Sequence, residues 1–395
     1  MIDILVMTAA YIMSQFYRSF LAVLVPALKS DLGATDSMLS TAAGAFFIVF
    51  ALSQFGVGVA LDRFGPRRTA SFLLLLAGGG GALIFAAATT PIMIVIAMSL
   101  LGLGCAPVMM ATTVLFARRF DAARLALLLS VFIGVGSAGN VAGTTPLALA
   151  AEEYGWRAVM IGLAAVTVII AVAAFFVVRD PPSAGSQDSA KGLRGTLELL
   201  KIKALWPVLI MSVVVYSPAA NIRGLWAGPF LAERYGADAI TIGHATLAMA
   251  IAMVIGSFAY GPLDALFRTR KWVTIVGNVV ALAALVALIF VVGQPIFTAV
   301  VLFVVLGLFG AAYGVVMAHG RAFVPVEMTG RGVTLINFFG IGGAGLCQWA
   351  SGAIGAATPP EIRYEAVFGF YAATLAIGLL IFLFAKDAKP GLRSS

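Results

Sequence analysis

The sequence predicts an all-α membrane protein, with twelve transmembrane helices in two pseudo-symmetric six-helix bundles. Its composition, its long apolar runs and one polar interruption near the middle indicate this class. Of the 395 residues, 62% are hydrophobic and 11% are charged, and the mean hydropathy is +1.05. A soluble domain carries roughly 25% charged residues. Because so few charges cannot cover a water-exposed surface, the composition excludes soluble and disordered proteins and makes lipid the main solvent.

Twelve apolar runs are long enough to cross a bilayer, which takes about 20 residues in a helix. The runs are continuously apolar and do not alternate as barrel strands do, so each predicts a helix. The predicted spans are 4–27, 39–61, 70–88, 92–114, 126–150, 157–178, 205–231, 239–262, 272–292, 296–319, 333–356 and 366–385.

Residues 179–204 interrupt these runs with Pro, Gly, Ser and charged residues, which are typical of a linker. The linker leaves six spans on each side. We therefore expect an N-terminal six-helix bundle at 1–178, a cytoplasmic linker at 179–204 and a C-terminal bundle with a short cytoplasmic tail at 205–395.

The distribution of Lys and Arg predicts the orientation. With the N-terminus inside, 19 of the 25 basic residues lie in inner segments and four lie in outer ones. This bias places both termini in the cytoplasm, in the inner membrane of a bacterial cell. Topology thus explains the net charge of +8, and we expect no nucleic-acid partner. The two cysteines, Cys105 and Cys347, lie in apolar runs and predict no disulfide framework.

The loop after the second span reads Gly-Val-Ala-Leu-Asp-Arg-Phe-Gly-Pro-Arg-Arg over 58–68. It resembles the inner-loop signature of the major facilitator superfamily, G-x-x-x-D-R-x-G-R-R, and 260–271 resembles a weaker copy after the eighth span. The resemblance implies a monomeric carrier whose halves rock around a substrate held near the membrane midplane. It also implies that the loop residues latch the inward-closed state without touching substrate: Gly58, Asp62, Arg63, Gly65, Arg67, Arg68, Asp264 and Arg268.

Two arginines lie well inside predicted spans, Arg18 in the first and Arg223 in the seventh. Each costs about 2.5–3.5 kcal/mol at a helix centre. Arg223 follows Arg18 by 205 positions, and Asp264 follows Asp62 by 202, so the arginines occupy nearly equivalent places in the two halves. No Asp or Glu lies deep in any predicted span. The natural counter-ion is therefore a substrate phosphate or carboxylate, which a guanidinium can bind with two parallel hydrogen bonds.

Polar and aromatic residues near the arginines are candidates to line the same cavity. Tyr11, Gln15 and Arg18 recur with helical spacing on one face, and Tyr216 shares a face with Arg223. The further candidates are Tyr17, Asn221, Trp226, Asn140, Tyr313 and Asn337. This arrangement is similar to that of organophosphate:phosphate exchangers of the superfamily, which bind phosphate between arginines on these two helices. A first-span arginine also occurs in its wider anion-transporting branches, so the anion is not identified.

These observations predict a secondary transporter for a small organic anion, either a carboxylate or a phosphorylated metabolite, working by exchange. Two alternatives stay open: an exporter of drugs or metabolites, and a transporter-like anion receptor. We expect no enzyme, no cofactor and no metal, because the sequence shows no nucleophile–base set, metal cluster or phosphate loop. The expected partners are a small anionic solute and membrane lipid. His244 and His319 lie near span ends, which favours structural roles, although proton coupling through His244 stays open.

Overall fold

A computed structural model describes residues 2–117, 119, 128, 131–180, 198–325 and 328–388. The side chains of Asp62 and Asp264, and residues 181–197 of the predicted linker, lie outside the described residues. The chain divides into two compact units, Met1–Ala190 and Lys191–Ser395. The division falls within the expected linker, and each unit is described by itself.

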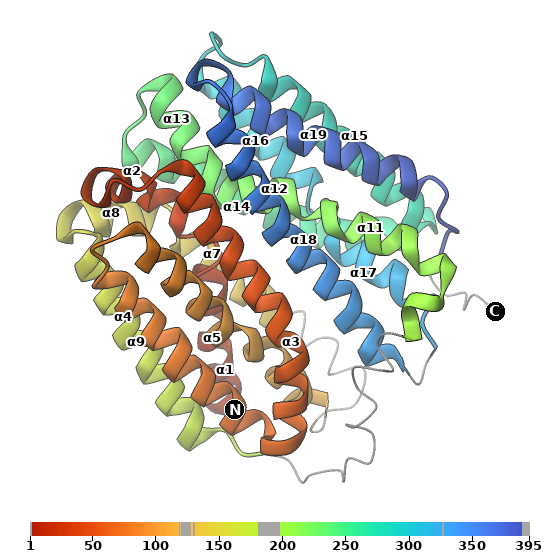
Figure 1. Cartoon of the computed structure of the whole chain (residues 1–395). Helices are drawn as coiled ribbons and strands as arrows, with labels where there is room; N and C mark the ends of the chain where they lie inside the picture. The colour runs from red at the N-terminus through yellow and green to blue at the C-terminus, as the bar shows by residue number, and fades with distance from the viewer. Residues whose placement is uncertain are drawn as a thin grey trace. The chain divides into compact units, whose positions relative to one another are not determined.

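Unit 1 contains the first half of the helices. In it α3 packs along α5, and α4 packs along α9 (Figure 1). Its helices are α1 (Ile2–Phe16), α2 (Leu21–Leu32), α3 (Asp36–Leu73), the π-helix η1 (Leu74–Gly79), α4 (Gly80–Ala86), α5 (Pro91–Ala117), α7 (Ala138–Ala142), α8 (Thr145–Tyr154) and α9 (Trp156–Val177).

Unit 2 contains the second half. In it α14 packs on α16, α15 on α19, and α11 on α18. Its helices are η3 (Leu199–Lys201), η4 (Lys203–Leu205), α11 (Trp206–Val215), α12 (Ser217–Asn221), the π-helix η5 (Ile222–Trp226), α13 (Ala227–Tyr235), α14 (Ala239–Phe267), α15 (Arg270–Ile289), α16 (Ile296–Phe309), α17 (Tyr313–Arg321), α18 (Thr329–Ala357), η7 (Pro360–Ile362) and α19 (Arg363–Phe382).

Ten helices in the described part of the chain are long and apolar enough to cross a membrane, and the bent pair α1 and α2 makes an eleventh. The predicted span 126–150 begins among residues that the structure does not describe. Three spans that the sequence predicts as regular helices are irregular. The first breaks between α1 and α2 with a bend of 52°, the third contains η1, and the seventh breaks at Tyr216 and continues through η5.

Glycines in the fifth span allow it to lie directly on the first. A Cβ added to Gly139 would lie 1.9 Å from the backbone oxygen of Ile12, and one added to Gly136 would lie 2.1 Å from Cδ1 of Tyr11. In lipid, no hydrophobic effect drives helices together. Close packing of one backbone against another stabilises their association instead. These glycines therefore let α7 and the residues just before it pack on α1.

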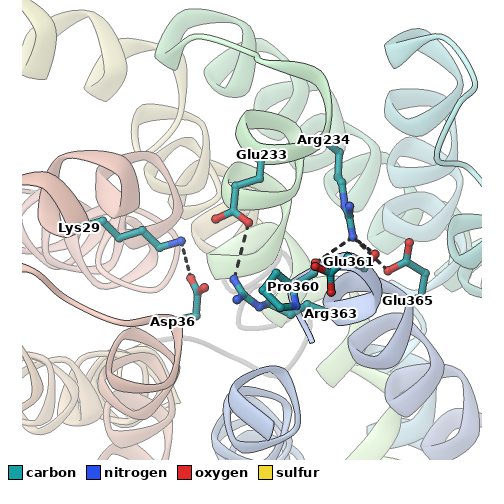
Figure 2. A network of polar contacts seen from close by, with 8 residues as sticks. All are labelled: Lys29, Asp36, Glu233, Arg234, Pro360, Glu361, Arg363 and Glu365. Carbon is teal, nitrogen blue, oxygen red and sulfur yellow. Dashed lines mark hydrogen bonds and ion pairs between the residues drawn. The ribbon is translucent and has the colours of Figure 1, made fainter. Parts of the chain in front are cut away.

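The four basic residues that the sequence places in outer segments each form an ion pair with an acidic side chain. Unit 1 contains Lys29–Asp36 at 2.8 Å and Arg157–Asp31 at 3.3 Å, and unit 2 contains Arg234–Glu365 at 3.4 Å and Arg363–Glu233 at 3.7 Å. Figure 2 shows Lys29 with Asp36, and the pairs that join the end of α13 to the start of α19. These contacts hold the ends of helices that belong to the same unit.

Candidate substrate site

Arg18 lies at the break in the first span, within the turn 17–20 between α1 and α2. Its guanidinium carbon lies 4.5 Å from the centre of the Phe50 ring of α3, a cation–π arrangement. Its Nε is buried and has no hydrogen-bond partner among the described residues. The chain thus leaves helical geometry where it places a permanent positive charge inside the membrane.

Tyr11 and Gln15 share one face of α1, as their spacing predicts. The Gln15 amide donates to the Tyr11 hydroxyl, with Nε2 and Oη 3.3 Å apart. Arg18 does not extend this face as a third helical position, because α1 ends at Phe16. The prediction that Arg18 continues this face as a third helical position is therefore wrong, since Arg18 lies in the turn that follows α1.

Arg223 occupies the corresponding place in unit 2. It lies in the π-helix η5, and only 3% of its surface is exposed. Tyr216, at the break before α12, interacts electrostatically with it. Short π-helical segments occur frequently at functional sites, because the wider turn redirects side chains.

A polar cluster connects the break in the seventh span with two other helices of unit 2. The rings of Tyr216 and Tyr313 lie 5.7 Å apart between centroids. The Tyr313 hydroxyl donates to Oδ1 of Asn337 at 2.9 Å. The structure therefore brings together three of the predicted residues, Tyr216, Tyr313 and Asn337, from the seventh span, α17 and α18.

Several other candidates are held in helix packing. Tyr17 is fully buried, and its hydroxyl shares a 2.8 Å hydrogen bond with Thr167 of α9. Trp226 donates to the Ser351 hydroxyl at 2.9 Å, and Asn221 donates to the Ala344 carbonyl at 2.8 Å. Asn140 lies half-buried in α7. Tyr17, Trp226 and Asn221 thus bind neighbouring helices of their own units through their polar atoms.

The signature loop contains a sharp break at Gly65, where φ is 82° and ψ is 163° inside α3. Only glycine adopts such angles without strain. A Cβ there would also lie 2.6 Å from Cγ of Asp180, which follows α9. The Asp180 carboxylate accepts a hydrogen bond from the backbone N–H of Arg67 at 2.7 Å. It therefore satisfies a donor at the start of the helical segment after the break.

Unit 2 repeats this arrangement. Asp387 follows α19 and lies 207 positions after Asp180. It accepts hydrogen bonds from the backbone N–H groups of Arg270 at 3.3 Å and Lys271 at 3.1 Å, and from the Thr269 hydroxyl at 2.6 Å. In both units, a carboxylate that follows the last span thus caps the N-terminus of the third span of that unit. Sequence analysis missed both residues, although each follows a basic residue, Arg179 or Lys386, directly after the last span of its half.

The remaining signature residues lie around these capped turns. Arg63 stacks on Phe64 with 5.2 Å from its guanidinium carbon to the ring centre, and Arg67 stacks on Phe175 at 4.5 Å. Arg68 is exposed, and a Cβ added to Gly58 would lie at an ordinary van der Waals distance of 3.9 Å from Cε of Met110. Arg268 follows α14 in the left-handed helical conformation, with φ at 52° and ψ at 32°, whereas Gly65 in the other half combines a positive φ with an extended ψ.

The two histidines differ in environment. His319 is fully buried, and its Nε2 lies 2.9 Å from the backbone oxygen of Lys386. This contact ties α17 to the segment after α19. His244 is exposed near the start of α14.

Comparison with known families fits this repeated architecture. The family model described as Major Facilitator Superfamily matches the chain twice, over residues 7–227 and 208–395. The chain belongs to the major facilitator superfamily. Together with the helical architecture this confirms the predicted fold class, and it makes the protein an integral multi-pass membrane transporter.

Solved structures share the fold along the whole chain at low identity. A D-xylose–proton symporter is similar with a TM-score of 0.79 and 14% identity, covering 97% of each chain. An inward-facing, occupied bacterial homologue of the human lysosomal transporter Spinster gives 0.75 and 17%, covering 97% of this chain and 96% of that one. A point mutant of the nucleoside transporter NupG gives 0.74 and 14%, covering 97% of this chain and 99% of that one. No curated protein matches the sequence significantly. These likenesses show the fold and not the substrate.

Proposed function

We propose that this superfamily member moves a small organic anion, a carboxylate or a phosphorylated metabolite, across the inner membrane by alternating access. Arg18 carries the proposal. Its guanidinium lies in a broken span, packed on Phe50, with a buried Nε that no described residue accepts from. A guanidinium keeps its charge at any physiological pH, so an anionic ligand is the group that best satisfies it.

Arg223 is the second residue of the proposed anion site. It is buried in η5 of the other unit, at a position 205 residues after Arg18. The matching positions and the irregular backbone at both support a common role. Discontinuous membrane helices are the segments from which many carriers build their substrate sites.

The neighbouring polar groups would orient the anion. Gln15 and Tyr11 share one face of α1, and Tyr216, Tyr313 and Asn337 are joined in unit 2 by a tilted ring contact and a hydrogen bond. Hydroxyl and amide groups of this kind discriminate between substrates that differ in a single polar group. Tyr17, Trp226 and Asn221 would support the site through their hydrogen bonds to neighbouring helices.

Exchange follows from the energetics of buried charge. Closing an empty cavity over the guanidinium of Arg18, whose buried Nε has no hydrogen-bond partner among the described residues, takes a cation out of water without compensation, which is costly. A bound anion removes that cost, so the loaded carrier should reorient faster than the empty one. In this mechanism the signature loops 58–68 and 260–271 hold the inward-closed state, and both termini lie in the cytoplasm, as the basic inner segments indicate. We propose that one chain, with one such site, functions as a monomer.

The test is thermal stabilisation of the purified protein in detergent by phosphate, sugar phosphates, mono- and dicarboxylates, and two cationic drugs. A ligand at about 100 times its dissociation constant should add about 2.7 kcal/mol of stability. We expect one anion class to stabilise the wild type and to lose its effect in Arg18→Gln and in Arg223→Gln. Arg321→Gln removes an exposed charge at the end of α17 and should respond like the wild type.

Two outcomes would contradict the proposal. Stabilisation only by the cationic drugs, unchanged in both variants, would favour a drug exporter and make the arginines structural. Anion binding without any flux into proteoliposomes would favour a receptor.

A further inference from the structure

An apolar groove on unit 1 lies between α9 and the segment formed by α3 and η1. It has a volume of about 160 Å³. Seven side chains line it: Ser71, Phe72, Leu75, Ala171, Val172, Phe175 and Phe176. Phe72 is 51% exposed and Phe176 is 76% exposed, so the groove opens to the surface that faces lipid.

Two polar groups make this groove different from a plain lipid-facing surface. The Ser71 side chain is 3% exposed, and its hydroxyl has no hydrogen-bond partner among the described residues. Arg67 lies one helical turn before Ser71, so it continues the groove on the same helix face. Its guanidinium stacks on the groove residue Phe175, and its buried Nε also lacks a hydrogen-bond partner in the described part of the chain.

The charge at this end of the groove is positive. Arg68 is exposed next to Arg67 in sequence, and Arg179 is exposed beside Asp180, which contacts the Arg67 backbone. The carboxylate of Asp180 is directed to the backbone N–H of Arg67 and the turn at Gly65, where it offsets the positive end of a helix. An apolar channel that ends at an arginine suits a molecule with an acyl chain and a negatively charged head.

We propose that this groove binds an anionic phospholipid, with one acyl chain along α9 and its phosphate at Arg67 and Ser71. Basic pockets between membrane helices on the cytoplasmic side are suited to anionic headgroups. Arg67 and the Ser71 hydroxyl donate to the phosphate oxygens, and Phe175 holds the guanidinium plane in place. The site belongs to unit 1 alone and is independent of the proposed substrate anion.

Native mass spectrometry of the delipidated, full-length protein tests the proposal by titration with phosphatidylglycerol and with phosphatidylcholine of the same acyl chains. For the wild type we expect tighter binding of phosphatidylglycerol by about fivefold, the effect of one basic residue near an anionic headgroup. Arg67→Gln should abolish this preference. Arg63→Gln removes the same charge from the same loop without touching Phe175, and it should keep the preference.

A second pair of variants tests the acyl channel. Val172 lines the groove and is 42% exposed, and Ile169 is 66% exposed on the same helix outside it. Val172→Trp should weaken the tightest binding of both lipids, whereas Ile169→Trp should not. Equal binding of the two lipids by the wild type, an unchanged preference in Arg67→Gln, or equal effects of the two tryptophans would each overturn the proposal.

Discussion

Many charged side chains in this protein form an ion pair or accept hydrogen bonds from a helix N-terminus. The four basic residues predicted to lie in outer segments form ion pairs, and the acidic residues Asp180 and Asp387 accept hydrogen bonds from backbone N–H groups at helix N-termini. Arg18 and Arg223 instead lie inside broken spans, and the buried Nε of Arg18 has no hydrogen-bond partner among the described residues. Their position inside the spans is the reason to assign these two arginines to the substrate.

Gly139 gives a direct prediction for helix contact. Gly139→Ala should destabilise the protein by about 1–3 kcal/mol, because the new methyl meets the Ile12 carbonyl, a backbone atom that cannot move aside. Gly162→Ala, in α9 with open space around it, should be neutral or stabilising by up to about 1 kcal/mol. Thermal unfolding in detergent checks both, and equal effects would contradict the packing argument.

Asp238 predicts a pH dependence. It caps α14 by accepting from Thr241, with Oδ1 and the backbone nitrogen 2.8 Å apart. Hydrogen bonding from the Thr241 side chain, and then from its backbone, lowers the pKa of the Asp238 carboxyl. Its stabilisation should therefore be complete above the unfolded pKa of about 3.9 and be lost as pH falls through the lower folded pKa. The melting temperature of wild type minus Asp238→Asn, measured from about pH 3 to 7, should fall only at the acid end.

Three spans deviate from a regular helix, and at each break the chain takes a direction that a straight helix would not give it. The first span bends by 52° at the turn that holds Arg18, and the seventh passes through η5 at Arg223. The third span begins after Gly65 with a cap supplied by a residue more than a hundred positions away. These elements are therefore completed by contacts within each unit and not by local sequence alone.

The repeated caps predict a matched effect in both units. Asp180→Ala and Asp387→Ala should each lower stability by about 0.5–2 kcal/mol, the usual cost of losing a cap at a helix N-terminus. Glu152→Ala removes an exposed acidic residue and should stay within about 0.5 kcal/mol. Denaturation of the three variants in detergent measures this, and an Asp387 variant as stable as the Glu152 control would argue against the shared cap.

In the molecule as a whole, the two units contain equivalent polar contacts at both ends of their helices. Glu233 follows Asp31 by 202 positions and Arg363 follows Arg157 by 206, so equivalent ion pairs join the first and last helices of each half. The caps at Asp180 and Asp387 repeat at the other ends. The family model matching twice agrees with this duplication.

The exchange mechanism makes a prediction for the whole carrier. Proteoliposomes loaded with the anion found in the stabilisation test should take up labelled anion much faster than empty ones, because the loaded carrier avoids closing over an uncompensated Arg18. Uptake rates with and without internal anion measure the ratio. Comparable rates in both would contradict exchange and leave facilitated transport of the anion.

Some parts of the molecule could be read from the sequence because their physical cause is local or compositional. Apolar runs of bilayer length allow only helices in lipid, so the spans and the fold class followed directly. The signature at 58–68 and its weaker copy indicated the superfamily. The intramembrane arginines stood out because a charge inside a span costs free energy wherever the rest of the chain lies.

Only the tertiary structure decided where those helices break and which polar groups are already engaged. Tyr17 and Trp226 lie close in sequence to the arginines, yet they bind Thr167 and Ser351 on helices more than a hundred residues away. Asp180 and Asp387 cap distant helices for the same reason. Helical periodicity predicts the face on which a side chain begins, but the partner that satisfies it depends on packing between helices, which no local pattern contains.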